Sequence, residues 1–174
     1  MPNYNGVWSL STQYQYATTW QNDNLPPTRA IFAGGASSNV IQFVLIGTLG
    51  NTTDFGNLAA NTDNLASVTS GTRYIGAGGD ASGNSNVIQY VEFATTGNSS
   101  DFGNLTVARA YLEGGSNGVR GVVGGGGNAG QNVMDYVTIA STGNATDFGD
   151  LTVARDVMGA VSSAVRICFA GGDS

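Results

Sequence analysis

The chain has 174 residues, a formal net charge of −6 at pH 7 and 27 glycines, but neither lysine nor histidine. Its six arginines are spread among twelve acids, whereas binding to nucleic acid or anionic lipid needs clustered positive charge. The absence of histidine also removes the most common metal ligand and the most common general base. We therefore predict one domain with no nucleic-acid partner, no cofactor and no catalytic apparatus.

Residues 1–28 come first and lie outside the repeat that fills the rest of the chain. Residues 6–16 alternate in the manner of a β-strand. The segment lacks the basic and then apolar layout of a signal peptide, and no apolar run approaches the roughly 18 residues of a membrane span. We predict an N-terminal strand or anchor segment over residues 1–28, and no membrane insertion.

Residues 29–174 are predicted to be a repeat domain, because two sequence series recur in phase. One is an Asp-Phe-Gly step, at intervals of 47 and 46 residues. The other is an arginine followed by a short segment and Gly-Gly. The first series begins at Asp54, Asp101 and Asp147, and the second at Arg29, Arg73, Arg120 and Arg166. The domain therefore holds about three and a half copies of one unit.

Each complete unit is predicted to contain four short strands. The first is rich in small residues, as in the stretches that begin at Leu65 and Val157. The second runs from the arginine to Gly-Gly. The third alternates between two faces, as between Val87 and Phe93, and the fourth surrounds the Asp-Phe-Gly step. Four-strand repeats of this length are typical of propeller blades, so we predict an all-β fold.

The order of these features resembles the kelch repeat, which also places Gly-Gly after its second strand. The resemblance implies a β-propeller or partial propeller of four-stranded blades. The chain departs from the kelch pattern because it lacks the tryptophan of the fourth strand. Phenylalanines occupy the comparable place, where we expect them to fill the space between blades: Phe55, Phe102 and Phe148.

A second resemblance concerns two particular stretches. Residues 136–155, YVTIASTGNATDFGDLTVAR, are similar to tandem repeats in virion proteins of tailed bacteriophages, marine cyanophages in particular. The opening GVWSLSTQYQ, residues 6–15, resembles the start of such proteins. This resemblance implies a structural or tail-associated protein located in the virion, with other virion proteins as partners.

Several motifs that suggest chemistry are better interpreted as structural. Asp-Phe-Gly also occurs in kinases, but a kinase needs a lysine and a histidine-containing catalytic loop. The glycine run 124–127 is not followed by the GK[ST] of a phosphate loop. Acids on the turns could bind calcium, but they lack the dense spacing of calcium loops. We predict no metal site at these acids: Asp54, Asp101, Asp147 and Asp150.

The repeated arginines have two interpretations. Arg29, Arg73, Arg120 and Arg166 could line a central channel and meet an anionic ligand. Such a repeated arginine more often bonds to the backbone, or to an acid of the neighbouring blade, and we favour this structural role.

The sequence predicts a non-enzymatic structural or adhesion component of a bacteriophage particle, in the tail, a fibre or the capsid. The alternative is a carbohydrate-binding module that stacks Tyr14, Tyr16 and Trp20 on sugars, with a host surface glycan as the ligand. Propeller enzymes such as galactose oxidase need copper-binding histidines, which are absent here. The two last predicted strands, 157–164 and 166–172, would leave an open apolar edge. We expect residues 6–16 of the same chain or of a neighbour to pair with it, and favour a homo-oligomer.

Overall fold

The computed structural model describes residues 29–127 and 130–174, and all regular elements in this part are β-strands. The predicted all-β class is therefore confirmed for the described residues. The predicted N-terminal segment 1–28 lies outside them, as do its strand at 6–16 and the aromatic residues proposed to stack on sugars. No helix in the described part is long and apolar enough to cross a membrane.

The strands form four antiparallel sheets that follow the sequence repeat. Unit 1 contains β1 (Arg29–Ala33), β2 (Val40–Leu45) and β3 (Thr53–Asn57). Unit 2 contains β4 (Ala66–Thr69), β5 (Arg73–Ala77), β6 (Val87–Glu92) and β7 (Ser100–Asn104). Unit 3 contains β8 (Glu113–Ser116), β9 (Arg120–Gly124), β10 (Gln131–Thr138) and β11 (Thr146–Arg155). Unit 4 contains β12 (Gly159–Ser162) and β13 (Ile167–Ala170).

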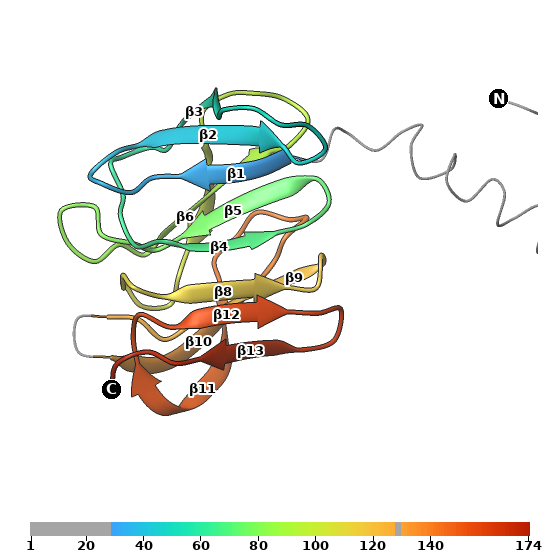
Figure 1. Ribbon diagram of the computed structural model, residues 1–174. Coiled ribbons are helices and arrows are strands. Elements are labelled where there is room, and N and C mark those ends of the chain that lie inside the picture. Colours follow the sequence, from blue (N-terminus) through green and yellow to red (C-terminus); the bar gives the residue numbers. More distant parts are fainter. Residues whose placement is uncertain (1–28, 128–129) are drawn as a thin grey trace, which may run out of the picture.

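The order of strands within each sheet is the chain order, and units 2 and 3 each contain the four strands that the sequence predicted. Figure 1 shows the sheets stacked one after another, with unit 1 at one end and unit 4 at the other. The first strands of units 2, 3 and 4 contact one another in turn, β4 against β8 and β8 against β12. The described residues form an open stack and not a closed ring of blades.

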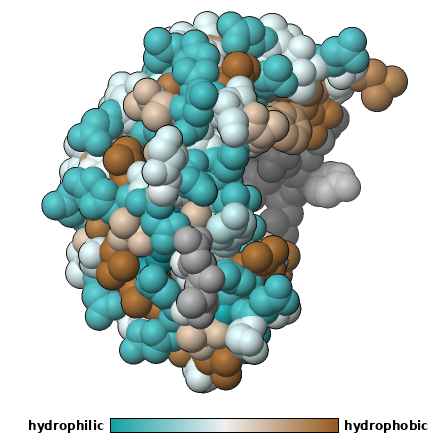
Figure 2. Space-filling model, turned by 90° about the vertical axis from the view of Figure 1, so that its left-hand side faces the viewer, coloured by the Kyte–Doolittle hydropathy of each residue, from teal (hydrophilic) through white to brown (hydrophobic). Residues whose placement is uncertain are grey.

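The hydrophobic core lies between neighbouring sheets. One cluster of buried side chains joins units 1 and 2 and includes Ile41, Phe55 and Val91. The other joins units 2 and 3 and includes Phe102 and Ile139. On the face of the molecule in Figure 2, polar residues predominate and apolar residues occur singly or in small groups. The apolar residues of the repeat therefore hold the stack together.

Small residues in the first and second strands allow two sheets to approach closely. Val68 of β4 packs where Gly114 of β8 and Gly121 of β9 have no side chain. A Cβ at Gly121 would lie 2.5 Å from a methyl group of Val68. The predicted small-residue strand is thus explained by contact between units.

The Gly-Gly pair turns the chain at the end of each second strand. In unit 2, Gly78 has a φ of +66° and Gly79 a φ of +101°, a region that L-residues with side chains seldom adopt. The amide of Gly79 donates to the carbonyl of Arg109 at 2.9 Å. A Cβ at Gly78 would lie 2.6 Å from the same oxygen. Glycine is therefore required for both its conformation and its lack of a side chain.

A left-handed residue precedes the first strand of units 2, 3 and 4. Asn64, Tyr111 and Val157 have φ values of +53°, +60° and +49°. The amide of Tyr111 donates to the carbonyl of Asn64 at 3.0 Å, and that of Val157 to the carbonyl of Tyr111 at 3.1 Å. This bend links successive units through the backbone alone.

Candidate functional site

The phenylalanines of the Asp-Phe-Gly steps pack against the third strand of their own unit. Phe55 meets Phe43 edge to face with centroids 5.9 Å apart, and Phe102 meets Tyr90 at the same distance. Phe55 and Phe102 are each only 2% exposed, within the two clusters that join units. Phe148 makes the same contact with Tyr136 at 6.1 Å but is 48% exposed. We expected all three to be buried between blades, and Phe148 differs because no sheet covers its outer side in the described structure.

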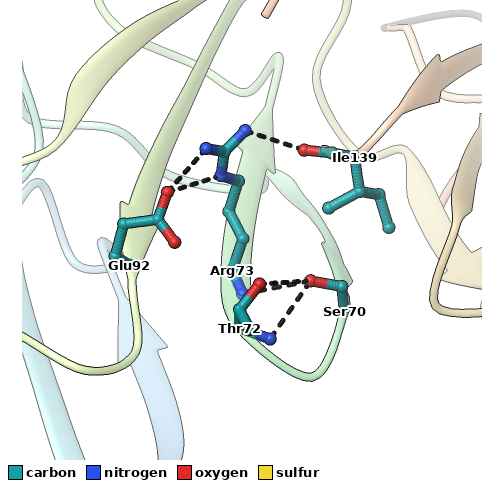
Figure 3. Close-up of polar contacts among 5 residues, drawn as sticks. All are labelled: Ser70, Thr72, Arg73, Glu92 and Ile139. Atoms are coloured by element: carbon teal, nitrogen blue, oxygen red, sulfur yellow. Dashed lines mark hydrogen bonds and ion pairs between the residues drawn. The ribbon is translucent and has the colours of Figure 1, made fainter. Parts of the chain in front are cut away.

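In units 1 and 2 the repeated arginine reaches the following unit. In unit 2 the guanidinium of Arg73 lies 4.3 Å from the ring centroid of Tyr90, within the range of a cation–π contact. Its Nη1 donates to the carbonyl of Ile139 in the loop after β10, at 2.8 Å (Figure 3). Its Nε and Nη2 donate to Oε1 of Glu92, at 2.8 Å and 2.6 Å. Arg73 therefore ties units 2 and 3 together.

Arg29 repeats this arrangement one unit earlier. Its guanidinium lies 4.7 Å from the ring centroid of Phe43, and its Nη1 donates to the carbonyl of Phe93 in unit 2. Phe93 and Ile139 occupy the same position of the repeat. Arg29 and Arg73 thus bond to the backbone of the neighbouring unit, which is the role that we favoured from the sequence.

The other two arginines are exposed. Arg120 lies 4.3 Å from the ring centroid of Tyr136. Neither Arg120 nor Arg166 donates a side-chain hydrogen bond to another of the described residues. Both line a hollow of about 390 Å³ between units 3 and 4, together with Phe148 and Phe169. The structure therefore separates the four arginines into two that are half-buried in contacts with the next unit and two that lie at an open surface.

The turn before each Asp-Phe-Gly step contains a Gly-Asn pair, and we call these segments the Gly-Asn loops: Gly50-Asn51, Gly97-Asn98 and Gly143-Asn144. Those of units 2 and 3 make a second backbone connection between units. The loop of unit 2 docks on β3 of unit 1. Gly97 N donates to the carbonyl of Phe55 at 2.8 Å, and Asn57 N donates to Oδ1 of Asn98 at 3.0 Å. A third bond runs from Ser99 N to the carbonyl of Asn57 at 2.9 Å.

The loop of unit 3 docks on β7 of unit 2 in the same way. Gly143 N donates to the carbonyl of Phe102 at 2.7 Å, and Ala145 N to the carbonyl of Asn104 at 2.8 Å. Asn104 N donates to Oδ1 of Asn144 at 3.0 Å. The loop docking between units 1 and 2 is thus repeated, bond for bond, between units 2 and 3.

This docking explains the glycine of the Asp-Phe-Gly step. Gly56 and Gly103 have φ values of +152° and +147°. A Cβ at Gly56 would collide with the carbonyl of Gly97, and one at Gly103 with the carbonyl of Gly143. The step therefore receives the next unit, in place of the metal-binding role that it has in kinases.

Sequence reasoning missed a buried ion pair between units 2 and 3. Nη2 of Arg109 donates to Oδ2 of Asp135 at 2.9 Å, and both side chains are fully buried. Oδ1 of Asp135 accepts a hydrogen bond from Oγ1 of Thr106 at 2.6 Å. A sequence signal was available, because units 1 and 2 carry Thr62 and Gln89 at the corresponding positions. Both positions are thus neutral at the interface of units 1 and 2 and charged at the interface of units 2 and 3.

The groups with shifted pKa values do not lie together in one site. Burial raises the pKa of Tyr74, whose hydroxyl lies 3.1 Å from Oγ of Ser67. Burial lowers the pKa of Arg109, and the neighbouring Asp135 opposes that shift. No group of three or more acids and cysteines with metal-binding geometry occurs in residues 29–127 and 130–174, where the four candidate calcium acids lie. The repeated polar residues of the stack serve contacts between units.

A scan against models of known protein families finds no match to this chain, and a search of curated protein sequences finds none either.

Proposed function

We propose that the chain is a non-enzymatic structural or adhesion component of a bacteriophage particle, built as an open, kelch-like partial propeller. The observation that carries the proposal is the use of the repeated residues. Arg73, Phe102 and Gly103 each contact the following unit or leave room for it. A scaffold of this kind extends by addition of units and presents its loops and outer strands to partners.

The location in a virion is supported by the resemblance of residues 136–155 to tandem repeats of phage virion proteins. These residues form the end of β10, the Gly-Asn loop and β11. The resemblance thus falls on the part of the unit that joins one repeat to the next. A segment that joins repeats is suited to a protein that is present in many copies in an assembled particle.

Mass spectrometry of density-purified phage particles tests the proposal. We expect peptides of the repeat at a stoichiometry of several copies per particle, and antibody labelling at one structural feature such as the tail or a fibre. A protein found only in the lysate, and removed by purification of the particles, would contradict the proposal.

Carbohydrate binding remains the alternative prediction. Its candidate stacking residues Tyr14, Tyr16 and Trp20 lie outside the described residues. A glycan array with the full chain, compared with a Tyr14→Ala, Tyr16→Ala, Trp20→Ala variant, distinguishes it from a purely structural role. Binding that the triple variant loses would favour the carbohydrate-binding module.

A further inference from the structure

The outer side of unit 3 carries the same docking groups as units 1 and 2, but the described residues leave them uncovered. We call Arg120, Tyr136 and residues 148–150 the acceptor face. Phe148 is 48% exposed, whereas the corresponding Phe55 and Phe102 are 2% exposed. A Cβ at Gly149 would meet no atom within 4 Å, although one at Gly56 or Gly103 would collide with a Gly-Asn loop.

Unit 1 carries the complementary groups, and these are exposed as well. We call residues 46–52 the donor segment, which contains the Gly-Asn loop of unit 1. Ile46 occupies the repeat position of Ile139, but Ile46 is 67% exposed and Ile139 only 1%. Leu49, in the same segment, is fully exposed. Among the described residues, the donor segment at one end of the stack and the acceptor face near the other are therefore both uncovered.

The edge of β13 is open in the same region. In units 2 and 3 the second strand pairs with a third strand, but β13 pairs only with β12 among the described strands. The sequence of β13 and its flanks, RICFAGG, closely matches RAIFAGG around β1. β1 pairs with β2 from Arg29 opposite Leu45 to Ala33 opposite Ile41. β13 can therefore take the place of β1 beside a β2 strand, in the same register.

We propose that a second copy of the chain inserts β2, the donor segment and β3 beside unit 4, with β13 of the first copy replacing β1 of the second. The result is a complete four-stranded sheet made by two chains. This inference goes beyond the proposed function and does not depend on location in a virion.

The internal interfaces specify the contacts across the two copies. Arg120 donates to the carbonyl of Ile46, as Arg73 donates to that of Ile139. Gly50 N donates to the carbonyl of Phe148, and Asp150 N donates to Oδ1 of Asn51, as the Gly-Asn loops of units 2 and 3 do. The exchange of β13 for β1 retains the ladder of β2, and the new contacts cover Phe148 and Ile46.

The joint is head to tail, because the donor and acceptor belong to different surfaces of the chain. Such a heterologous contact repeats until it closes a ring or extends as a filament. An occupant from residues 1–28 of the same chain would instead cover the acceptor face within a monomer. The two arrangements are separated by the measurements below.

A labelled peptide of residues 39–58, which spans β2, the donor segment and β3, is the direct probe. We expect saturable binding of one peptide per full-length chain. A peptide with Ile46→Asp and Asn51→Ala should bind at least about tenfold more weakly. Because these changes are in the peptide, folding of the protein does not affect the comparison. A peptide that does not bind, or equal binding of both peptides, would overturn the proposal.

Self-association is the second readout, measured by sedimentation velocity over a range of micromolar concentrations. We expect the full chain to associate with rising concentration and Ile46→Asp to associate at least about tenfold more weakly. Val119→Asp is the matched control, since Val119 is 66% exposed and lies outside both surfaces. A chain that is monomeric throughout, or equal effects of the two substitutions, would overturn the second copy as the occupant.

Discussion

The interfaces between units 1 and 2 and between units 2 and 3 share their backbone bonds but differ in one buried pair. In the first, Oε1 of Gln89 accepts from Ala59 N at 2.9 Å and from Ser99 Oγ at 2.7 Å, and Thr62, at the repeat position of Arg109, is buried. In the second, Asp135 occupies the place of Gln89 and pairs with Arg109. A β-bulge directly before Gln89 and before Asp135 directs both side chains to the preceding unit. The repeat therefore requires a satisfied polar acceptor at this position, and the charge on it is secondary.

Removal of one polar side chain should destabilise the protein more at the interface with the ion pair than at the neutral one. A buried ion pair must recover the free energy of removing two charges from water, and loss of one partner leaves the other charge buried. Nε and Nη1 of Arg109 have no hydrogen-bond partner among the described residues. The two interfaces should therefore respond very differently to equivalent substitutions.

The largest difference is expected between Asp135→Ala and Gln89→Ala. Asp135→Ala leaves Arg109 charged and unpaired, which should lower the free energy of unfolding by about 3 to 5 kcal/mol. Gln89→Ala should cost about 1 to 3 kcal/mol, because only neutral donors lose their acceptor. Urea denaturation of both variants measures the difference. Equal losses would contradict the distinction between the interfaces.

The phenylalanines should separate the covered and uncovered units. Phe102→Ala and Phe55→Ala should each lower the free energy of unfolding by about 3 to 5 kcal/mol, because a buried ring leaves a cavity between sheets. Phe148→Ala should cost less than about 1.5 kcal/mol, because about half of the ring already contacts water in the folded chain. The measurement is urea denaturation at a concentration where the chain is monomeric. A Phe148→Ala loss as large as that of Phe102→Ala would show that this ring is covered.

Transplanting the neutral pair sharpens the comparison. The double variant Arg109→Thr, Asp135→Gln places the neutral side chains of the first interface in the second and removes both buried charges, so its loss should be at least about 2 kcal/mol smaller than that of Asp135→Ala. Arg109→Thr alone is the control, because it leaves the Asp135 carboxylate without its cation. With Asp135→Gln as the other single variant, thermal and urea melts of the set form a double-mutant cycle. A double variant less stable than Asp135→Ala would show that the two interfaces are not interchangeable.

The left-handed bend extends the comparison to the junction of units 3 and 4. Asn64 tolerates this backbone conformation, but Val157, with φ of +49°, is β-branched and strained there. Val157→Asn should raise the free energy of unfolding of the β12–β13 region by about 1 kcal/mol. Asn64→Val is the reciprocal control and should cost a similar amount. Hydrogen exchange of the β12 and β13 amides gives the local value.

The smallest effect concerns Glu113, which stands where unit 2 has Ala66. Burial raises the pKa of Glu113 above its ordinary value of 4.5, so the unfolded chain releases this proton first as pH rises. Stability from this group is thus present below pH 4.5 and is lost as pH rises through the raised pKa. Glu113→Gln should therefore raise the free energy of unfolding at pH 7. At a pH below both pKa values, where Glu113 is protonated in both states, the substitution should have little effect. Melts across this range test the sign.

Much of the fold could be predicted from the sequence because the pattern is local and repeated. The alternation after Val87 and the Gly-Gly pairs indicate strands and turns within one unit. The contacts between units were harder to predict, since the pairing of Arg109 with Asp135 depends on how a β-bulge meets the preceding sheet. The exposure of Phe148 likewise depends on which neighbour is present, a property that the residue itself does not carry.

The Gly-Asn docking has a consequence for how the chain opens. Its side-chain bonds join residues only 41 and 40 positions apart, from one unit to the next. Each sheet therefore depends energetically on its immediate neighbours, as in a one-dimensional lattice. Opening can begin at the two-stranded unit 4 and advance by one interface at a time, without first disrupting units 1 and 2. Amide protection should accordingly form a gradient along the stack, highest where a sheet has neighbours on both sides.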